Sequence, residues 1–326
     1  MGLSRPTGPK TLLIGGRALT LPVLFPSVSS VKTNLRPVDY VEVLTAIQEP
    51  QFLVSAYDIA NAATGERKRL VRRLAEAAKE ACLLMDSGNY ESFWHRDRTW
   101  SATRYFRVLK SSPANLAFCF DNQRPAKDLK RAAAAVSHEV DAAQSVTNVT
   151  SVLPIVHGGP ADLPSRVAGV ASQSRPLMLA VPERCLGDGI LARAATVRAI
   201  RRALDSVQPD CALHLLGTGN PVALAAYAIA GAQSFDGLEW CQTCADPTTG
   251  KLLHFQHREL VREMSRGIVA GLPYAQATLV HNLLFFRDWM RRLRESLDRG
   301  THAEFLRACT SPATVRQLGA SLRGRT

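Results

Sequence analysis

The sequence has no apolar run that approaches the roughly 20 residues a helix needs to cross a bilayer. Its first residues also lack the pattern of a secretory signal peptide, in which a positive start precedes an apolar stretch and a small-residue cleavage site. The seven cysteines are scattered, and most of them, such as Cys82 and Cys119, lie within apolar runs rather than in a disulfide framework. These absences predict reduced thiols, a cytoplasmic location and no membrane partner.

Acidic residues are scarce relative to basic ones, with 28 Asp and Glu against 40 Lys and Arg, so that the formal net charge is +12. An excess of this kind favours a polyanion partner, because neutralising phosphates releases counterions. A single group of basic residues is most simply explained as the solvated face of a helix, whereas the net charge of the whole chain favours nucleic acid as the partner. The basic residues gather in three clusters: Arg67, Lys68, Arg69, Arg72 and Arg73; Arg198, Arg201 and Arg202; and Arg287, Arg291, Arg292 and Arg294.

The chain does contain a repeated alternation of short apolar segments with longer amphipathic ones. Continuous Val, Leu and Ile segments of strand length are typical of a parallel sheet that is buried on both faces. Eight of them occur, at 23–28, 52–57, 82–86, 116–121, 151–159, 177–183, 212–219 and 234–240. Eight strand–helix units predict an α/β fold of the (β/α)8 TIM-barrel class.

The remainder of the chain predicts additions to the barrel. Residues 240–257 have the pattern of a β-hairpin with its turn near ADPTTG, and the last third is helical. We expect one catalytic domain over residues 1–310. Residues 311–326 would form a tail that could be mobile.

Three of the apolar segments end in a carboxylate, namely Asp86, Asp121 and Asp236. Catalytic groups of such barrels come from the carboxyl ends of the strands, which meet at one mouth. Paired carboxylates at a mouth can cleave a glycosidic bond, one as nucleophile and the other for proton transfer. The alternative is that these acids cap the helices that follow, and it weighs most for Asp121, because Ser87 and Gly88 after Asp86 and Gly237 after Asp236 allow a ligand to approach closely.

Seven motifs, in chain order over about residues 12–300, together resemble the tRNA-guanine transglycosylase superfamily. The chain looks closest to the branch that acts on DNA, the DpdA-like transglycosylases, which insert 7-deazaguanines. The motifs are VLFPSVSSVKTNL (23–35), LLMDSGNYESF (83–93), LPIVHGG (153–159), LAVPE (179–183), LLGTGNP (215–221), SFDG (234–237) and HNLLFF (281–286).

The resemblance implies a mechanism and a role for individual residues. Asp236 matches the nucleophile that attacks the sugar C1′ and holds the nucleic acid covalently, and Asp86 matches the general acid/base at the base. Asp121 matches an acid that reads the base edge, and Tyr90 matches the aromatic residue that stacks on the base. Ser87 and Gly88 shape the same loop. The base would have to be extruded from any duplex to enter such a pocket.

The chain departs from the pattern in the base pocket. It has His157 where the family usually has Gln, and Leu177 and Met178 where the family usually has two glycines before the LAV motif. Larger side chains there would close or reshape the approach to guanine, and His157 could carry a charge. The sequence therefore predicts a base other than plain guanine, unless a shifted backbone recovers the same contacts.

The family's zinc site is also incomplete. His281 matches its histidine, but no cysteine lies between Cys244 and His281. Cys241 and Cys244 form a C-x-x-C that is followed by His254 and His257, a spacing that superficially resembles a metal site. We expect no metal and no cofactor, and a structural role for His281.

Several functions remain open from the sequence. The leading one is cleavage of a base–sugar bond in DNA, either by base exchange or by excision of a modified, phage-derived base as in antiviral defence. The alternatives are a transglycosylase that acts on tRNA, a non-catalytic nucleic-acid-binding subunit and a glycoside hydrolase. Relatives often dimerise, which makes a homodimer plausible.

Overall fold

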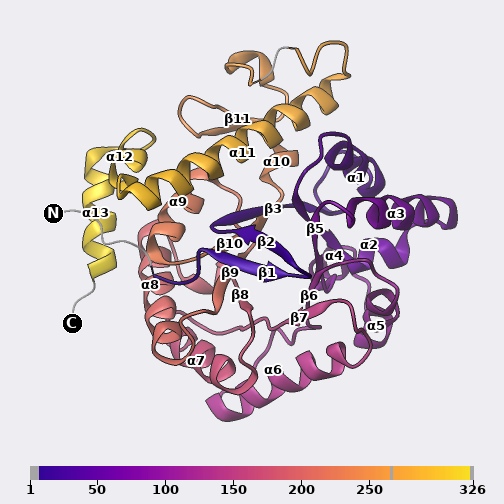
Figure 1. Cartoon of the computed structure of the whole chain (residues 1–326), viewed down its shortest axis with the longest axis vertical. Coiled ribbons are helices and arrows are strands. Elements are labelled where there is room, and N and C mark those ends of the chain that lie inside the picture. Colours follow the sequence, from indigo (N-terminus) through magenta and orange to yellow (C-terminus); the bar gives the residue numbers. More distant parts are fainter. Residues whose placement is uncertain (1–6, 265–266, 324–326) are drawn as a thin grey trace.

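The computed structural model describes residues 7–264 and 267–323, and its centre is a barrel of eight parallel strands (Figure 1). The strands are β3 (Val23–Val28), β4 (Gln51–Ser55), β5 (Cys82–Asp86), β6 (Leu116–Phe118), β7 (Ser151–Leu153), β8 (Met178–Pro182), β9 (Ala212–Leu216) and β10 (Ser234–Gly237). They pair in the order β7-β6-β5-β4-β3-β10-β9-β8. A parallel bridge between Ile155 and Ala180 joins the two ends of the sheet. The predicted (β/α)8 barrel is confirmed.

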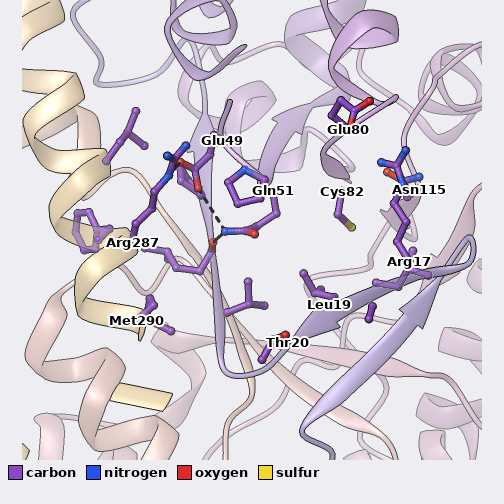
Figure 2. A pocket seen from close by; sticks show the side chains of 18 of the residues that line it. Arg17, Leu19, Thr20, Glu49, Gln51, Glu80, Cys82, Asn115, Arg287 and Met290 are labelled. Atoms are coloured by element: carbon purple, nitrogen blue, oxygen red, sulfur yellow. Dashed lines mark hydrogen bonds and ion pairs between the residues drawn. The ribbon is translucent and has the colours of Figure 1, made fainter. Parts of the chain in front are cut away.

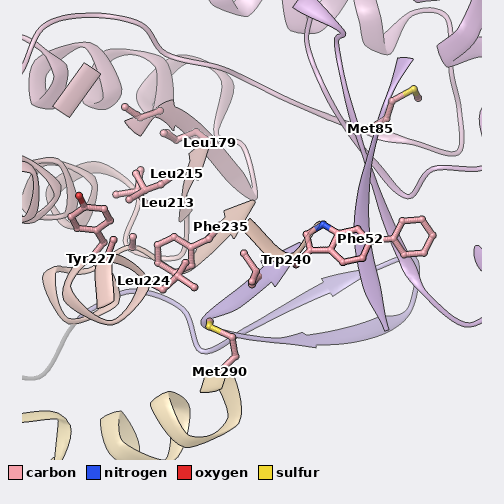
Figure 3. Close-up of a cluster of buried hydrophobic side chains, with 14 of the residues drawn as sticks. Phe52, Met85, Leu179, Leu213, Leu215, Leu224, Tyr227, Phe235, Trp240 and Met290 are labelled. Carbon is pink, nitrogen blue, oxygen red and sulfur yellow. The ribbon is translucent and has the colours of Figure 1, made fainter. Parts of the chain in front are cut away.

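Helices surround the strands on the outside (Figure 1). They are α1 (Pro37–Ala46), α2 (Ala56–Asn61), α3 (Thr64–Ala77), α4 (Asn89–Trp94), α5 (Ala102–Lys110), α6 (Leu129–Gln144), α7 (Leu163–Ser174), the short 3-10 helix η1 (Glu183–Leu186), α8 (Ile190–Val207) and α9 (Pro221–Ala230). The strands' outward side chains, such as Leu213, Leu215 and Phe235, pack against these helices in one apolar layer (Figure 3). Because side chains alternate along a strand, the residues between them point into the barrel.

The interior of the barrel holds a second apolar core that an N-terminal hairpin closes. Phe25, Leu84 and Phe118 are fully buried there. Strands β1 (Thr11–Ile14) and β2 (Arg17–Thr20) pair antiparallel and add Leu12, Ile14 and Leu19 to the same core. This hairpin was not among the elements expected from the sequence, the first of which begins at residue 23. The signal was present in the turn Gly15-Gly16, where both residues have positive φ (+55° and +79°), a conformation that glycine adopts readily.

The segment after the barrel matches the expected additions. α10 (Glu239–Gln242) follows β10 directly, and β11 (Thr243–Ala245) pairs antiparallel with β12 (Leu252–His254), which confirms the predicted hairpin. The 3-10 helix η2 (Arg258–Leu260), α11 (Tyr274–Arg299), α12 (His302–Arg307) and α13 (Pro312–Arg323) complete the described chain. α13 lies in the segment expected as a tail and buries Val315, Leu318 and Leu322. Among the described residues, none of the helices is both long and apolar enough to span a membrane.

A cavity of about 340 Å³ lies at the amino-terminal end of the barrel, between the β1–β2 hairpin and α11 (Figure 2). Glu49 is almost fully buried there and accepts a hydrogen bond of 2.8 Å from Arg287 Nε. Arg287 also donates to the carbonyl of Ile47 at 2.8 Å. Burial raises the pKa of Glu49 from its ordinary value of 4.5 to about 7, although the charge of Arg287 acts in the opposite direction. This end of a barrel contributes to stability rather than to chemistry.

We therefore expect Arg287→Ala to lower the free energy of unfolding by about 3 kcal/mol at pH 8, because Glu49 is left charged and unpaired in the interior. The loss should be smaller at pH 5. The native pKa of Glu49 lies above that of the unfolded chain, so its contribution to stability falls as the pH rises from about 4.5 to about 7. Urea unfolding at both pH values measures the difference.

Arg291→Ala is the matched control for this variant. Arg291 lies on the same helix but pairs with Asp288 and Glu295 at the surface. Its loss should change the free energy of unfolding little at either pH, because solvent screens exposed ion pairs. An equal loss for Arg287→Ala at pH 5 and pH 8 would contradict a role through the charge of Glu49.

Candidate active site

A pocket of about 450 Å³ opens at the carboxyl ends of the strands, the opposite end of the barrel from the first cavity. Its lining residues are Ser27, Val28, Ser29, Lys32, Leu53, Asp86, Ser87, Asn89, Tyr90, Glu91, Asp121, Gln123, Ile155, His157, Pro182, Glu183, Arg184, Arg193, Leu216, Gly217, Asp236, Gly237, Leu238, Glu239 and Gln242. Strands or strand-end loops from all around the barrel contribute. The barrel thus brings together seven of the nine site residues expected from the sequence: Asp236, Asp86, Asp121, Tyr90, Ser87, His157 and, through its contact with Asp86, Gly88.

Asp236 points into this pocket because Phe235, its neighbour on β10, points outward into the apolar layer. Its Oδ2 accepts a hydrogen bond from Ser27 Oγ at 2.8 Å. Its Oδ1 accepts from the backbone N–H of Gly217 at 3.0 Å and lies 3.1 Å from His214 Nε2. Three donors therefore fix the plane of the carboxylate from both sides.

His214 is itself held in place beneath Asp236. It is fully buried, and its Nδ1 lies 2.7 Å from Ser234 Oγ. Because a carboxylate only accepts, Nε2 carries the hydrogen toward Asp236, while Nδ1 is hydrogen-bonded to the serine hydroxyl. The roles of His214 and Ser27 were not predictable from the sequence, since both lie within apolar strand segments and only their inward register reveals them.

Asp86 ends β5 and faces the same pocket. Its Oδ2 accepts a hydrogen bond of 3.0 Å from the backbone N–H of Gly88. Burial raises the pKa of Asp86 well above its usual range, and the nearby charges of Glu91, Asp121 and Asp236 raise it further. The environment therefore favours a protonated Asp86 beside the hydrogen-bonded Asp236 carboxylate. Two carboxyls in such different surroundings are suited to different roles.

Gly88 cannot be replaced without moving the loop that follows Asp86. Its φ is +85°, and a Cβ there would lie 2.5 Å from the Tyr57 Cβ and 2.7 Å from the Tyr57 backbone nitrogen. Ser87, its neighbour, donates to Asp121 Oδ1 at 3.2 Å, and its carbonyl accepts from Trp100 Nε1 at 3.0 Å. The loop thus fixes the position of Asp86 relative to Asp121.

Asp121 and His157 form an ion pair on the far wall of the pocket. His157 Nε2 lies 2.5 Å from Asp121 Oδ2, and Asn89 Nδ2 donates to Asp121 Oδ1 at 2.7 Å. Burial lowers the pKa of His157, but hydrogen bonds to Asp121 and Cys185 outweigh it and raise the pKa to about 9. Burial would raise the pKa of Asp121, and the contacts with His157 and Asn89 reverse this and lower it. Both oxygens of Asp121 are therefore engaged, and His157 is held between Asp121 and Cys185 at the wall of the pocket.

Leu177 and Met178, expected at the base pocket, are not brought to it. Met178 begins β8 and is fully buried in the barrel interior, and Leu177 packs against the same interior cluster. Both lie at the amino end of the strand, and Ala180 separates Met178 from the mouth. The residues that β8 and its following turn bring to the pocket are Pro182 and Glu183. Leu177 and Met178 precede these two residues by five positions, and neither is among the residues that line the pocket.

Two further carboxyls line the pocket and were not identified from the sequence. Glu91 on α4 accepts from Ser29 Oγ at 2.6 Å and from Ser55 Oγ at 2.7 Å, and burial raises its pKa to about 7. Glu239 on α10 lies against Gly219 and Gly237, where a methyl group on either glycine would overlap its Oε2. Burial raises the pKa of Glu239 to about 7 as well. Residues 234–240 were expected to be one strand, but β10 ends at Gly237 and the chain turns into α10.

The residues considered for a metal are engaged otherwise. His281 is fully buried, its Nε2 lies 2.8 Å from the Ala245 carbonyl, and its Nδ1 accepts from the Met264 N–H at 3.3 Å. Burial lowers its pKa. Cys241 lies on α10 and Cys244 on β11. Within residues 7–264 and 267–323, no group of three or more His, Cys, Asp or Glu side chains could hold a metal ion. His281 joins the hairpin to α11.

The three basic clusters of the sequence are partly internal. Arg201 is fully buried and donates to the Cys211 carbonyl at 2.7 Å, and Arg198 donates to the Ile229 carbonyl at 2.9 Å. Arg69 and Arg73 pair with Glu42 on α1. The cations at the candidate active site are others, namely Lys32, Arg184 and Arg193.

A scan of the chain against models of protein families finds no match, and a search among curated proteins finds none either. The resemblance to the transglycosylase superfamily therefore stays a prediction.

Proposed function

We propose that this protein cleaves the N-glycosidic bond between a base and its sugar in nucleic acid, with DNA as the favoured substrate, through a covalent intermediate on Asp236. The observation that carries the proposal is the unlike environment of two carboxyls in one pocket. Asp236 accepts three hydrogen bonds that orient it, whereas Asp86 has a pKa well above its usual range. A nucleophile and a general acid need these two environments.

The proposed reaction has two steps. The Asp236 carboxylate forms a bond to C1′ while the bond from C1′ to the base nitrogen breaks. The electron pair of that bond leaves with the base, which takes a proton from Asp86. In the second step either water or a replacement base attacks C1′, releases the Asp236 carboxylate and returns a proton to Asp86. Water yields an abasic site, and a replacement base yields exchange.

The size and polarity of the pocket support a nucleotide as the ligand. A volume of about 450 Å³ is within the usual range for a small-molecule pocket. Lys32, Arg184 and Arg193 line it and would attract the phosphates on either side of an extruded nucleotide. The ion pair of Asp121 and His157 also lines the pocket and gives its far wall a polar surface that a base edge could contact.

The test is to incubate the protein with unmodified DNA, modified phage DNA and tRNA, each with and without free 7-deazaguanine, and to identify released bases by mass spectrometry. We expect a base from DNA. Release without incorporation would show excision, and incorporation would show exchange. Faster turnover on tRNA would favour the tRNA alternative, and binding without any release would favour a non-catalytic subunit.

A further inference from the structure

Helix α4 carries an unusual concentration of exposed aromatic side chains. Tyr90, Phe93 and Trp94 are 36%, 70% and 46% exposed. The other large apolar side chains that are exposed in the described part of the chain are aliphatic and lie on other elements. The next helix, α5, buries its aromatic residue Tyr105 completely in the core. The three rings of α4 are exposed instead. An exposed aromatic cluster on one helix marks an interaction surface.

This surface is continuous with the candidate active site. Tyr90 and Lys32 both line the pocket. Trp94 lies one helical turn beyond Tyr90, with 6.4 Å between the ring centroids, and Phe93 contacts Trp94 edge-on at 5.6 Å. The Lys32 ammonium lies 3.7 Å from the centre of the Trp94 ring. From the pocket outward, the order is therefore a ring, a cation and two further rings.

The backbone at Lys32 is held by its surroundings. Its φ is +55°, and its carbonyl accepts a hydrogen bond of 3.0 Å from Gln242, which also lines the pocket. A cation held against an indole ring gains from the ring's quadrupole and stays available to an anion on its other side. A phosphate entering the pocket mouth would meet this ammonium first.

We propose that Tyr90, Phe93, Trp94 and Lys32 form a binding surface for an unpaired nucleotide next to the one in the pocket, so that the protein takes a single-stranded segment of nucleic acid. A base stacks on Trp94 or Phe93, and the phosphate that joins it to the nucleotide in the pocket contacts Lys32. Stacking on aromatic side chains and a cation that follows the backbone are what single-strand binding requires. The inference rests on the proposed function, because it takes a nucleotide as the pocket's occupant.

Paired bases in a duplex hide the ring faces that this surface would contact, so it distinguishes single strands from duplexes. The duplex would still gain from Lys32, but not from the rings. The charge of the surface argues against an apolar protein segment as the occupant, because Arg96 and Arg98 directly after α4 are also exposed.

The experiment measures binding rather than chemistry. A fluorescein-labelled 15-nucleotide DNA of ordinary bases is titrated with the full-length protein, as a single strand and annealed to its complement. We expect Trp94→Ala and Phe93→Ala each to weaken single-strand binding about 10-fold, and to change duplex binding less than about 2-fold. Trp94→Phe should retain most of the affinity. Lys32→Ala should reduce the slope of log affinity against log salt concentration for single-strand binding, by about the contribution of one phosphate contact.

Val149→Ala is the control, since Val149 is 78% exposed and is not among the residues that line the pocket. Single-strand binding by Trp94→Ala that equals the wild type would overturn the inference, and so would an equal loss on single strand and duplex. A change in oligomeric state with unchanged DNA affinity would overturn it in favour of a contact between copies of the chain. Suppose that the variants weaken single-strand binding as expected but that no substrate releases a base. The binding surface is then supported, and the proposed cleavage reaction is contradicted.

Discussion

Replacing Asp236 by alanine is expected to reduce base release by at least about 10⁴-fold, because the variant has no group that can form the covalent bond to C1′. Denaturing gels of the wild-type protein with its substrate should show a DNA adduct that is absent from the variant. The adduct and the rate must disappear together, since both depend on the same carboxylate. Stopped assays that quantify free base and adduct over time measure this.

The variant also leaves polar groups without their partner, so the fold must be checked. Ser27, the Gly217 N–H and His214 would lose their shared acceptor, and buried groups left in this way cost about 1–3 kcal/mol each. Asp236→Asn keeps the shape and one acceptor oxygen, and it should be as inactive as the alanine variant with a smaller loss of stability. Undiminished base release by either variant would exclude Asp236 as the nucleophile.

The barrel and its mouth were predictable because they follow from short-range patterns. A strand that is buried on both faces is mostly apolar, so the strand segments were visible in the sequence. The first polar residue after such a run marks the strand's carboxyl end, and this identified Asp86 and Asp236. The hairpin formed by β11 and β12 was equally visible, because its turn residues are characteristic.

What could not be predicted depends on register and on long-range contacts. Leu177 precedes β8 and Met178 begins it, but only the length and inward alternation of the strand show that Pro182 and Glu183 reach the pocket. His214 looks like any residue of an apolar strand until β9 is placed beside β10, where it meets Asp236 from 22 positions away.

Glu239 shows the same limit at a turn. The segment 234–240 was expected to be a strand, but a single residue, Leu238, separates β10 from α10, and Gly219 packs closely against Gly237 at this turn. The residues next to Gly219 and Gly237 in the sequence give no sign that the two glycines meet. The carboxyl that results lies beside Asp236, and its pKa of about 7 makes it a second group that titrates near neutral pH in the pocket.

The second large effect is expected for Asp86→Asn, which should reduce base release by about 10²–10⁴-fold while oligonucleotide binding is retained. Asparagine has nearly the same shape but cannot protonate the leaving base. In the wild type, the rate should fall as the pH rises through the raised pKa of Asp86, because only the protonated form acts as the acid. The residual rate of Asp86→Asn should not show this fall at alkaline pH, which is the alkaline limb of the pH–rate profile. Single-turnover rates between pH 5 and pH 9 measure both effects.

Asp128→Asn is the matched control for this change. Asp128 caps α6 by accepting from the Arg131 N–H at 2.8 Å, and asparagine caps a helix about as well, so rate and stability should be unaffected. A pH profile of Asp86→Asn that keeps the alkaline limb would assign the titration to another group, such as Glu239.

Stability separates a catalytic role of Asp86 from a structural one. The native pKa of Asp86 lies above that of the unfolded chain, so its contribution to stability falls as the pH rises above the unfolded value. Asp86→Asn removes this penalty, and the variant should therefore unfold at a higher urea concentration than the wild type at pH 8, with little difference near pH 4. A residue retained for the fold would show the opposite sign. Loss of activity together with a gain of stability at pH 8 is the combination expected of a carboxyl held in a costly environment for its chemistry.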